Sequence, residues 1–130
     1  MIRGLEFLDD GDPDSALPCF IVSMKNKNPL GALALGNVLE QKFLEIYEDE
    51  VYHIGSDERI DNMLNMMIAA YMFGSVFAED AAEEIDVENR MGNIANCCYP
   101  EAQLRKICDS IGDNLQNYIS QSPELLLRFL

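Results

Sequence analysis

The sequence predicts an all-α fold, a compact single-domain bundle of six to seven helices over residues 1–130. Apolar residues recur at spacings of three and four, which places them on one face of each helix. Ser, Asp or Asn, often followed by proline, precedes these stretches, as expected where helices begin. The alternation typical of a half-buried strand never extends beyond a few residues, so the sequence argues against a sheet.

Two capping patterns organise the first third of the chain. After a turn-forming run of aspartates, Asp12 or Asp14 can cap a helix in which we expect Pro18 to fall in the tolerant first turn. Asn28 and Pro29 then start a long amphipathic helix that should reach about residue 50. Glycines at 31 and 36 indicate either close packing of another element or a break in that helix.

The helix around residues 57–78 is predicted to lie at the centre of the bundle. Ser56 can cap it, and beyond Met66 nearly every position is apolar, so the other helices should surround it. Its methionines fit a core better than an adaptable groove for a partner helix: Met63, Met66, Met67 and Met72.

Three further helices are expected towards the C-terminus. Asp86 can cap the first, and Tyr99 with Pro100 marks the start of a second that has a clean amphipathic pattern. The last, Glu124 to Leu130, is so apolar that it must dock on its own bundle, on a second copy or on a partner.

The charge balance limits the partners. The chain has 23 acidic and 9 basic side chains, a net charge of -14 and a pI near 4.2. Nucleic acid and anionic membranes attract Lys and Arg, so we expect no direct nucleic acid binding and no membrane binding. A basic protein partner would instead be steered towards this chain.

A calcium loop is the first candidate for metal chemistry. Asp10, Asp12 and Asp14 occupy the first, third and fifth positions of such a loop. The sixth position is Ser15 instead of glycine and the twelfth is Ile21 instead of glutamate. A capped turn is therefore the favoured interpretation, and no metal is predicted.

His53 and the cysteines offer little for catalysis. His53 is the only histidine, and we interpret it as a packing residue at a helix end, with a general base as the alternative. Adjacent Cys97 and Cys98 lack the spacer of redox or zinc motifs, so core packing is favoured over a redox role. Reduced thiols are expected throughout, and the sequence predicts neither an enzyme nor a cofactor.

Two acidic clusters are the strongest functional feature. Carboxylates late in the long helix oppose its dipole, so helix stability does not explain their position. If both clusters lie on one face, their carboxylates would present negative charge at a density similar to that of nucleic acid phosphates. The predicted partner-binding residues are Glu79, Asp80, Glu83, Glu84, Asp86 and Glu88, then Glu45, Glu48 and Asp49, with Tyr47 and Tyr52 as aromatic anchors.

These features lead to one hypothesis and two alternatives. The first is an acidic inhibitor that neutralises a basic partner such as a nuclease toxin or nucleic-acid-handling enzyme, like an immunity protein, antitoxin or phage-encoded inhibitor. The second is a helical adaptor or homo-oligomer, for example a homodimer formed through the C-terminal segment. An enzyme or small-molecule binder ranks last. The N-terminus lacks a signal peptide pattern, so a cytoplasmic location is expected.

Overall fold

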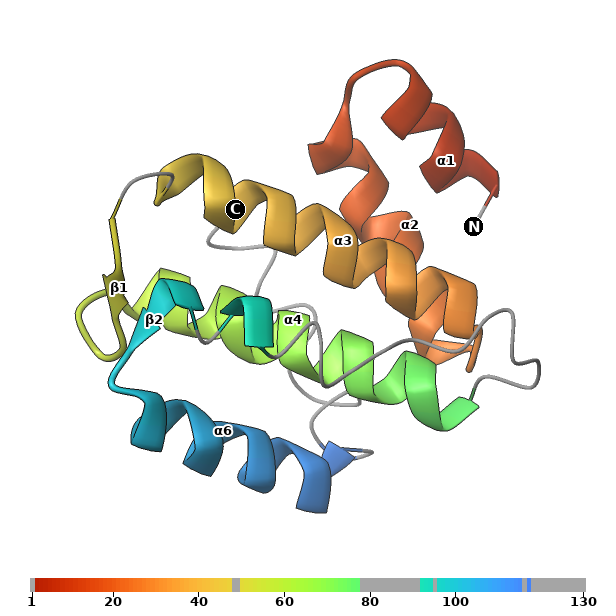
Figure 1. The fold of residues 1–130 in the computed structure, drawn as a ribbon. Coiled ribbons are helices and arrows are strands. Elements are labelled where there is room, and N and C mark those ends of the chain that lie inside the picture. The colour runs from red at the N-terminus through yellow and green to blue at the C-terminus, as the bar shows by residue number, and fades with distance from the viewer. Residues whose placement is uncertain (1, 48–49, 78–91, 95, 116, 118–130) are drawn as a thin grey trace.

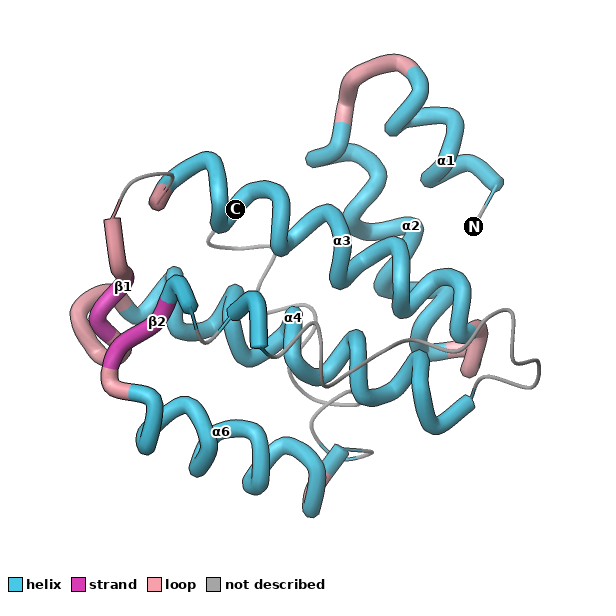
Figure 2. Tube along the Cα trace, in the orientation of Figure 1, coloured by secondary structure: helices cyan, strands magenta, loops and turns pink. Residues whose placement is uncertain are grey.

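The computed structural model describes residues 2–47, 50–77, 92–94, 96–115 and 117, and most of them are helical, which confirms the predicted fold class. The elements in order are α1 (Ile2–Asp9), α2 (Pro13–Lys25), α3 (Pro29–Ile46), β1 (Tyr52–His53), α4 (Glu58–Phe77), β2 (Cys98–Tyr99) and α6 (Glu101–Asp113) (Figure 1). Residues 92–94 and 96–97 are also helical. Figure 2 shows how little of the described chain lies in loops.

Helix α4 lies at the centre of the bundle, as the sequence predicted. It packs against α3 on one side and α6 on the other, while α2 packs against α3 and α1 packs against α2 (Figure 1). Met63, Met66 and Met67 are each no more than 1% exposed and Met72 is half-buried. Each fully buried side chain of this size stabilises the fold by about 1.5 to 3 kcal/mol. These methionines therefore form core, as predicted.

The predicted caps of α2 and α3 are confirmed. The Asp12 carboxylate accepts a hydrogen bond from the Ser15 N–H at 3.2 Å, and the Asn28 side chain accepts one from the Leu30 N–H at 3.0 Å. Each bond satisfies one of the backbone donors that a helix start leaves without an intrahelical partner. Both caps are local in the sequence, so short-range patterns were enough to predict them.

The cap of α4 is Asp57, one residue later than predicted. Its carboxylate accepts a hydrogen bond from the Arg59 N–H at 2.9 Å. Ser56 instead donates its hydroxyl hydrogen to the His53 carbonyl at 2.6 Å, which closes the turn before the helix. Both residue types are good caps, so only the turn geometry decides between them.

Pro18 corrects another prediction, because it lies inside α2 and not in its first turn. The helix begins at Pro13, so the carbonyl of Asp14 loses the N–H that residue 18 would normally supply. Pro18 and Asp14 are both exposed. The freed carbonyl therefore lies in a part of the helix that water can reach.

A short parallel strand pair also departs from the prediction of a fold without a sheet. Tyr52 lies opposite Cys98 and His53 opposite Tyr99, and the Ile54 N–H donates to the Tyr99 carbonyl at 2.9 Å. Two residues per strand are too few to produce an alternating pattern in the sequence. The pair ties the segment before α4 to the segment before α6, at one end of the bundle (Figure 1).

The remaining helix predictions are met in part. Helix α3 ends at Ile46 and not near residue 50. The helix that follows Pro100 is confirmed through Asp113, with Leu104 and Ile111 buried against the core. The helix from Asp86 and the segment Glu124 to Leu130 fall outside the described residues.

Close packing explains the predicted disturbance at Gly36. A Cβ atom at this position would lie 2.7 Å from a ring carbon of Tyr71 on α4, nearer than real Cβ atoms approach. Tyr71 itself is 0% exposed, so its ring has little room to move. Glycine at 36 therefore lets the two helices approach closely, and α3 continues through this position without a break.

Gly36→Ala should lower the free energy of unfolding by about 1 to 2 kcal/mol, because overpacking against Tyr71 outweighs the gain in helix propensity. Urea unfolding at neutral pH measures this change in the free energy of unfolding. Gly92→Ala is the matched control, since a Cβ there meets nothing within 4 Å. The control should be neutral or more stable, and a stabilised Gly36→Ala variant would contradict the packing argument.

Candidate functional site

Three aromatic rings meet where α3 ends and β1 begins. The ring centroids of Phe43 and Tyr47 are 5.2 Å apart, those of Tyr47 and Tyr52 are 5.1 Å apart, and those of Phe43 and Tyr52 are 6.0 Å apart. Phe43 and Tyr47 are one helical turn apart, so they share a face of α3. The chain then folds back and brings Tyr52 against them. We call these three residues the aromatic cluster.

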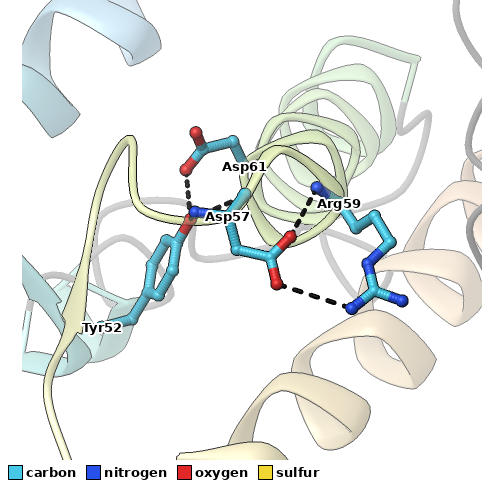
Figure 3. A network of polar contacts seen from close by, with 4 residues as sticks. All are labelled: Tyr52, Asp57, Arg59 and Asp61. Carbon is cyan, nitrogen blue, oxygen red and sulfur yellow. Dashed lines mark hydrogen bonds and ion pairs between the residues drawn. The ribbon is translucent and has the colours of Figure 1, made fainter.

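The hydroxyl of Tyr52 fixes the turn between β1 and α4 (Figure 3). It lies 2.5 Å from an Asp61 carboxylate oxygen and 2.8 Å from the Asp57 carbonyl oxygen, and it accepts a hydrogen bond from the Asp57 N–H at 3.3 Å. The Gly55 N–H donates to the same Asp61 oxygen at 3.1 Å. A hydroxyl has one hydrogen, and the carboxylate is the stronger of its two acceptors.

Negative charge is concentrated at this end of the molecule, and it contributes to raised pKa values of two tyrosines. The pKa of Tyr47 is raised by burial first, and then by the negative charges of Asp57, Glu50 and Asp61. The pKa of Tyr52 is also raised, by burial and by its hydrogen bond to Asp61. Carboxylates before β1 and at the start of α4 therefore act together on the Tyr47 hydroxyl. We call Glu45, Tyr47, Glu50, Asp57, Glu58 and Asp61 the acidic end.

Most of this negative charge has no counter-ion within the described chain. Arg59 pairs with Asp57 at 3.6 Å, and its side chain is 64% exposed. Among the described residues, neither Glu45, Glu50 nor Glu58 forms an ion pair, and all three are exposed. The acidic end therefore presents carboxylates to solvent, where a cationic partner could reach them.

The predicted partner-binding residues are only partly within the described chain. Glu45 is exposed on α3 and Tyr47 is half-buried beside it. Tyr52 is 1% exposed, so it packs in the core and offers a partner almost no surface. Glu48 and Asp49 lie outside the described residues, as do Glu79, Asp80, Glu83, Glu84, Asp86 and Glu88. That the two clusters share one face stays a prediction.

Four members of the acidic end were not predicted from the sequence to contact a partner. They are Glu50, Asp57, Glu58 and Asp61. Asp57 is the cap of α4, one residue after the predicted cap Ser56. Only the fold-back of β1 places it near Tyr47, 10 positions earlier in the chain. No short-range sequence pattern indicates that proximity.

Two of the three aspartates of the candidate calcium loop have structural roles. Asp12 caps α2, as predicted, and Asp14 forms an ion pair with Lys42, which links α2 to α3. Across the described residues, no group of three or more metal-ligating side chains is placed to hold an ion.

His53 lies on the surface, whereas the cysteines are half-buried or buried. His53 is exposed on β1, not packed at a helix end, and its ring stands edge-on to Tyr99 with centroids 5.7 Å apart. No disulfide joins the four cysteines, all of which lie within the described residues, and Cys98 is buried in the core as predicted, while Cys97 is half-buried. Burial, then the neighbouring Cys97 and Asp61, raises the pKa of the Cys98 thiol to about 12.

Comparison with protein-family models, curated proteins and solved structures finds no match to this chain. No helix within the described ranges has both the length and the apolar character needed to cross a lipid bilayer.

Tyr52→Phe should reduce the free energy of unfolding by about 1 to 3 kcal/mol at pH 8, because the Asp57 N–H and the Asp61 carboxylate lose a buried partner. The raised folded pKa of Tyr52 means that its contribution is complete below about pH 10, the ordinary tyrosine pKa, and is lost as pH rises further. The difference in free energy of unfolding between the wild-type protein and Tyr52→Phe should therefore shrink above pH 10. Urea unfolding at pH 8 and pH 11 tests this.

The exposed Tyr99 provides the control for that experiment. Its side chain is 59% exposed, so Tyr99→Phe should change stability by less than about 0.5 kcal/mol at either pH. Equal losses in the two variants would show that the Tyr52 hydroxyl has no special role in the turn.

Cys98 should react slowly with iodoacetamide in the folded protein. With a pKa of about 12, only about one thiol in ten thousand is a thiolate at pH 8, and the side chain is 2% exposed. Peptide mass spectrometry after timed labelling should find half-buried Cys19 and Cys97 modified before Cys98. In urea all four should label, and rapid native labelling of Cys98 would contradict its burial.

Proposed function

We propose that this chain is an acidic protein-binding inhibitor that neutralises a basic partner, such as a nuclease toxin or a nucleic-acid-handling enzyme. It would act like an immunity protein, an antitoxin or a phage-encoded inhibitor. The observation that carries the proposal is the convergence of Glu50, Asp57 and Asp61 on Tyr47. Carboxylates placed this close together can bind the basic surface with which a partner otherwise binds the phosphates of a nucleic acid.

Long-range attraction supports the proposal. A net charge of -14 over 130 residues produces a field that accelerates encounter with a cationic protein, by about 10 to 1000-fold at low salt. At physiological ionic strength the Debye length is about 8 Å, so the final approach depends on charges that lie close together. The acidic end supplies such a local group.

Exposed apolar side chains beside the carboxylates supply contact area. Leu44 is 44% exposed, Ile46 is 57% exposed and Val51 is 50% exposed. All three lie within a few residues of Tyr47 along the chain, at the end of α3 and before β1. Interfaces combine an apolar or aromatic centre with a polar rim, and hot spots are often tyrosines. The half-buried Tyr47 fits the centre, and Glu45 and Glu50 fit the rim.

Reversing three charges at the acidic end tests the proposal. Affinity capture from the source organism with mass spectrometry identifies the partner, and association kinetics are then measured with the purified protein at several salt concentrations. The triple variant Glu45→Lys, Glu50→Lys and Glu58→Lys should associate at least about 10-fold more slowly at low salt, with a weaker salt dependence.

The matched control reverses three exposed carboxylates elsewhere. Glu6→Lys, Asp109→Lys and Asp113→Lys change the net charge equally, on α1 and α6. This variant should retain most of the association rate. Equal slowing in both triples would show that net charge alone acts, and capture of no basic protein would overturn the proposed function.

A further inference from the structure

A pocket of about 320 Å³ opens beside the aromatic cluster, between the second half of α3 and residues 93, 94, 96 and 97. Its lining comes from two places in the chain: Glu40, Phe43 and Leu44, then Asn93, Ile94, Asn96 and Cys97. The volume is at the small end of the range for ligand sites, which is about 300 to 1,000 Å³. It suits one side chain better than a large cofactor.

The charged group in this lining, Glu40, is held by a buried tyrosine. The Tyr71 hydroxyl donates to a Glu40 carboxylate oxygen at 2.8 Å and also lies 3.0 Å from the Asn37 side-chain oxygen. Tyr71 is 0% exposed, and its ring rests against Gly36. A carboxylate accepts about four hydrogen bonds, so the contact with Tyr71 does not by itself saturate Glu40.

The other walls match the stem and the head group of an arginine. Phe43, Leu44 and Ile94 are apolar and can cover a chain of methylene groups. Asn93 and Asn96 also line the pocket, and each carries an amide oxygen that can accept a hydrogen bond. A guanidinium has five N–H donors in a planar fork and can meet several oxygens together, whereas an ammonium has three donors and is more strongly hydrated.

We infer that this pocket receives one arginine side chain of the basic partner, an inference that rests on the proposed function. Position supports it, because Leu44 belongs to the pocket and is also one of the exposed apolar residues beside Tyr47. Leu44 and Tyr47 are three residues apart on α3, about 4.5 Å along the axis. A partner that covers the acidic end therefore reaches the pocket.

An NMR titration of the full chain with N-acetyl-arginine methylamide tests the pocket without a partner. Backbone amides of Leu44 and Cys97 and the side-chain amides of Asn93 and Asn96 should shift saturably, with a dissociation constant on the order of millimolar for a single side chain. The uncharged citrulline analogue should bind at least about 5-fold more weakly, because it lacks the cation that pairs with Glu40.

Two glutamates on different helices provide the variant and its control. Glu40→Gln should weaken binding of the arginine probe by at least about 5-fold, whereas Glu6→Gln, an equal charge change on α1 outside the pocket lining, should alter it by less than about 2-fold. If Glu40→Gln fails to fold, Leu44→Trp at the exposed rim is the second variant, and it should block the shifts. Equal weakening by both glutamine variants, or citrulline binding as well as arginine, would overturn the inference.

The captured partner separates this inference from the proposed function. If Glu40→Gln speeds dissociation of the partner at least about 5-fold, the inference is supported. If reversal at the acidic end slows association but Glu40→Gln leaves dissociation unchanged, the function stands and the arginine pocket is wrong. If the probe binds but no basic protein is captured, the proposed function fails, and a partner side chain as the occupant fails with it.

Discussion

The close approach of α3 to α4 at Gly36 is the constraint on which the rest of the structure depends. It fixes the Tyr71 ring in the core, and Tyr71 in turn holds the Glu40 carboxylate from the side of α4. The same contact sets the register between the two helices. That register brings the end of α3, with Tyr47, against the start of α4, with Asp57 and Asp61. The pocket and the acidic end thus depend on one packing contact.

The acidic end opposes stability, and its local interactions offset the cost. Glu45 lies in the last turn of α3, where no basic residue balances the negative pole of the helix dipole. Glu50, Asp57 and Asp61 add repulsion around Tyr47. The aromatic cluster counters this, since each ring pair contributes about 0.5 to 1.5 kcal/mol beyond area burial. The hydrogen bonds of Tyr52 further anchor the turn. Charge kept at such a cost favours a role in binding.

The sequence predicted what is local and missed what depends on tertiary contacts. The caps at Asp12 and Asn28, the buried methionines and the central helix follow from spacing and short-range chemistry. The choice of Asp57 over Ser56, the β1–β2 pair and the burial of Tyr52 follow from how the turn folds back on α3. For the site, Glu45 and Tyr47 were predicted from composition. No sequence pattern indicated that Glu40 lines a pocket together with Asn93, Ile94, Asn96 and Cys97.

Two carboxylates of α3 would have different roles: Glu45 would attract a partner, and Glu40 would hold it once bound. Glu45 is exposed, so salt screens its attraction and its effect falls mainly on the association rate. Glu40 is half-buried and already held by Tyr71, so a cation there would meet a carboxylate that needs little reordering. Loss of such a contact acts mainly on the dissociation rate. A rigid α3 that carries both groups five residues apart would therefore separate the speed of capture from the lifetime of the complex.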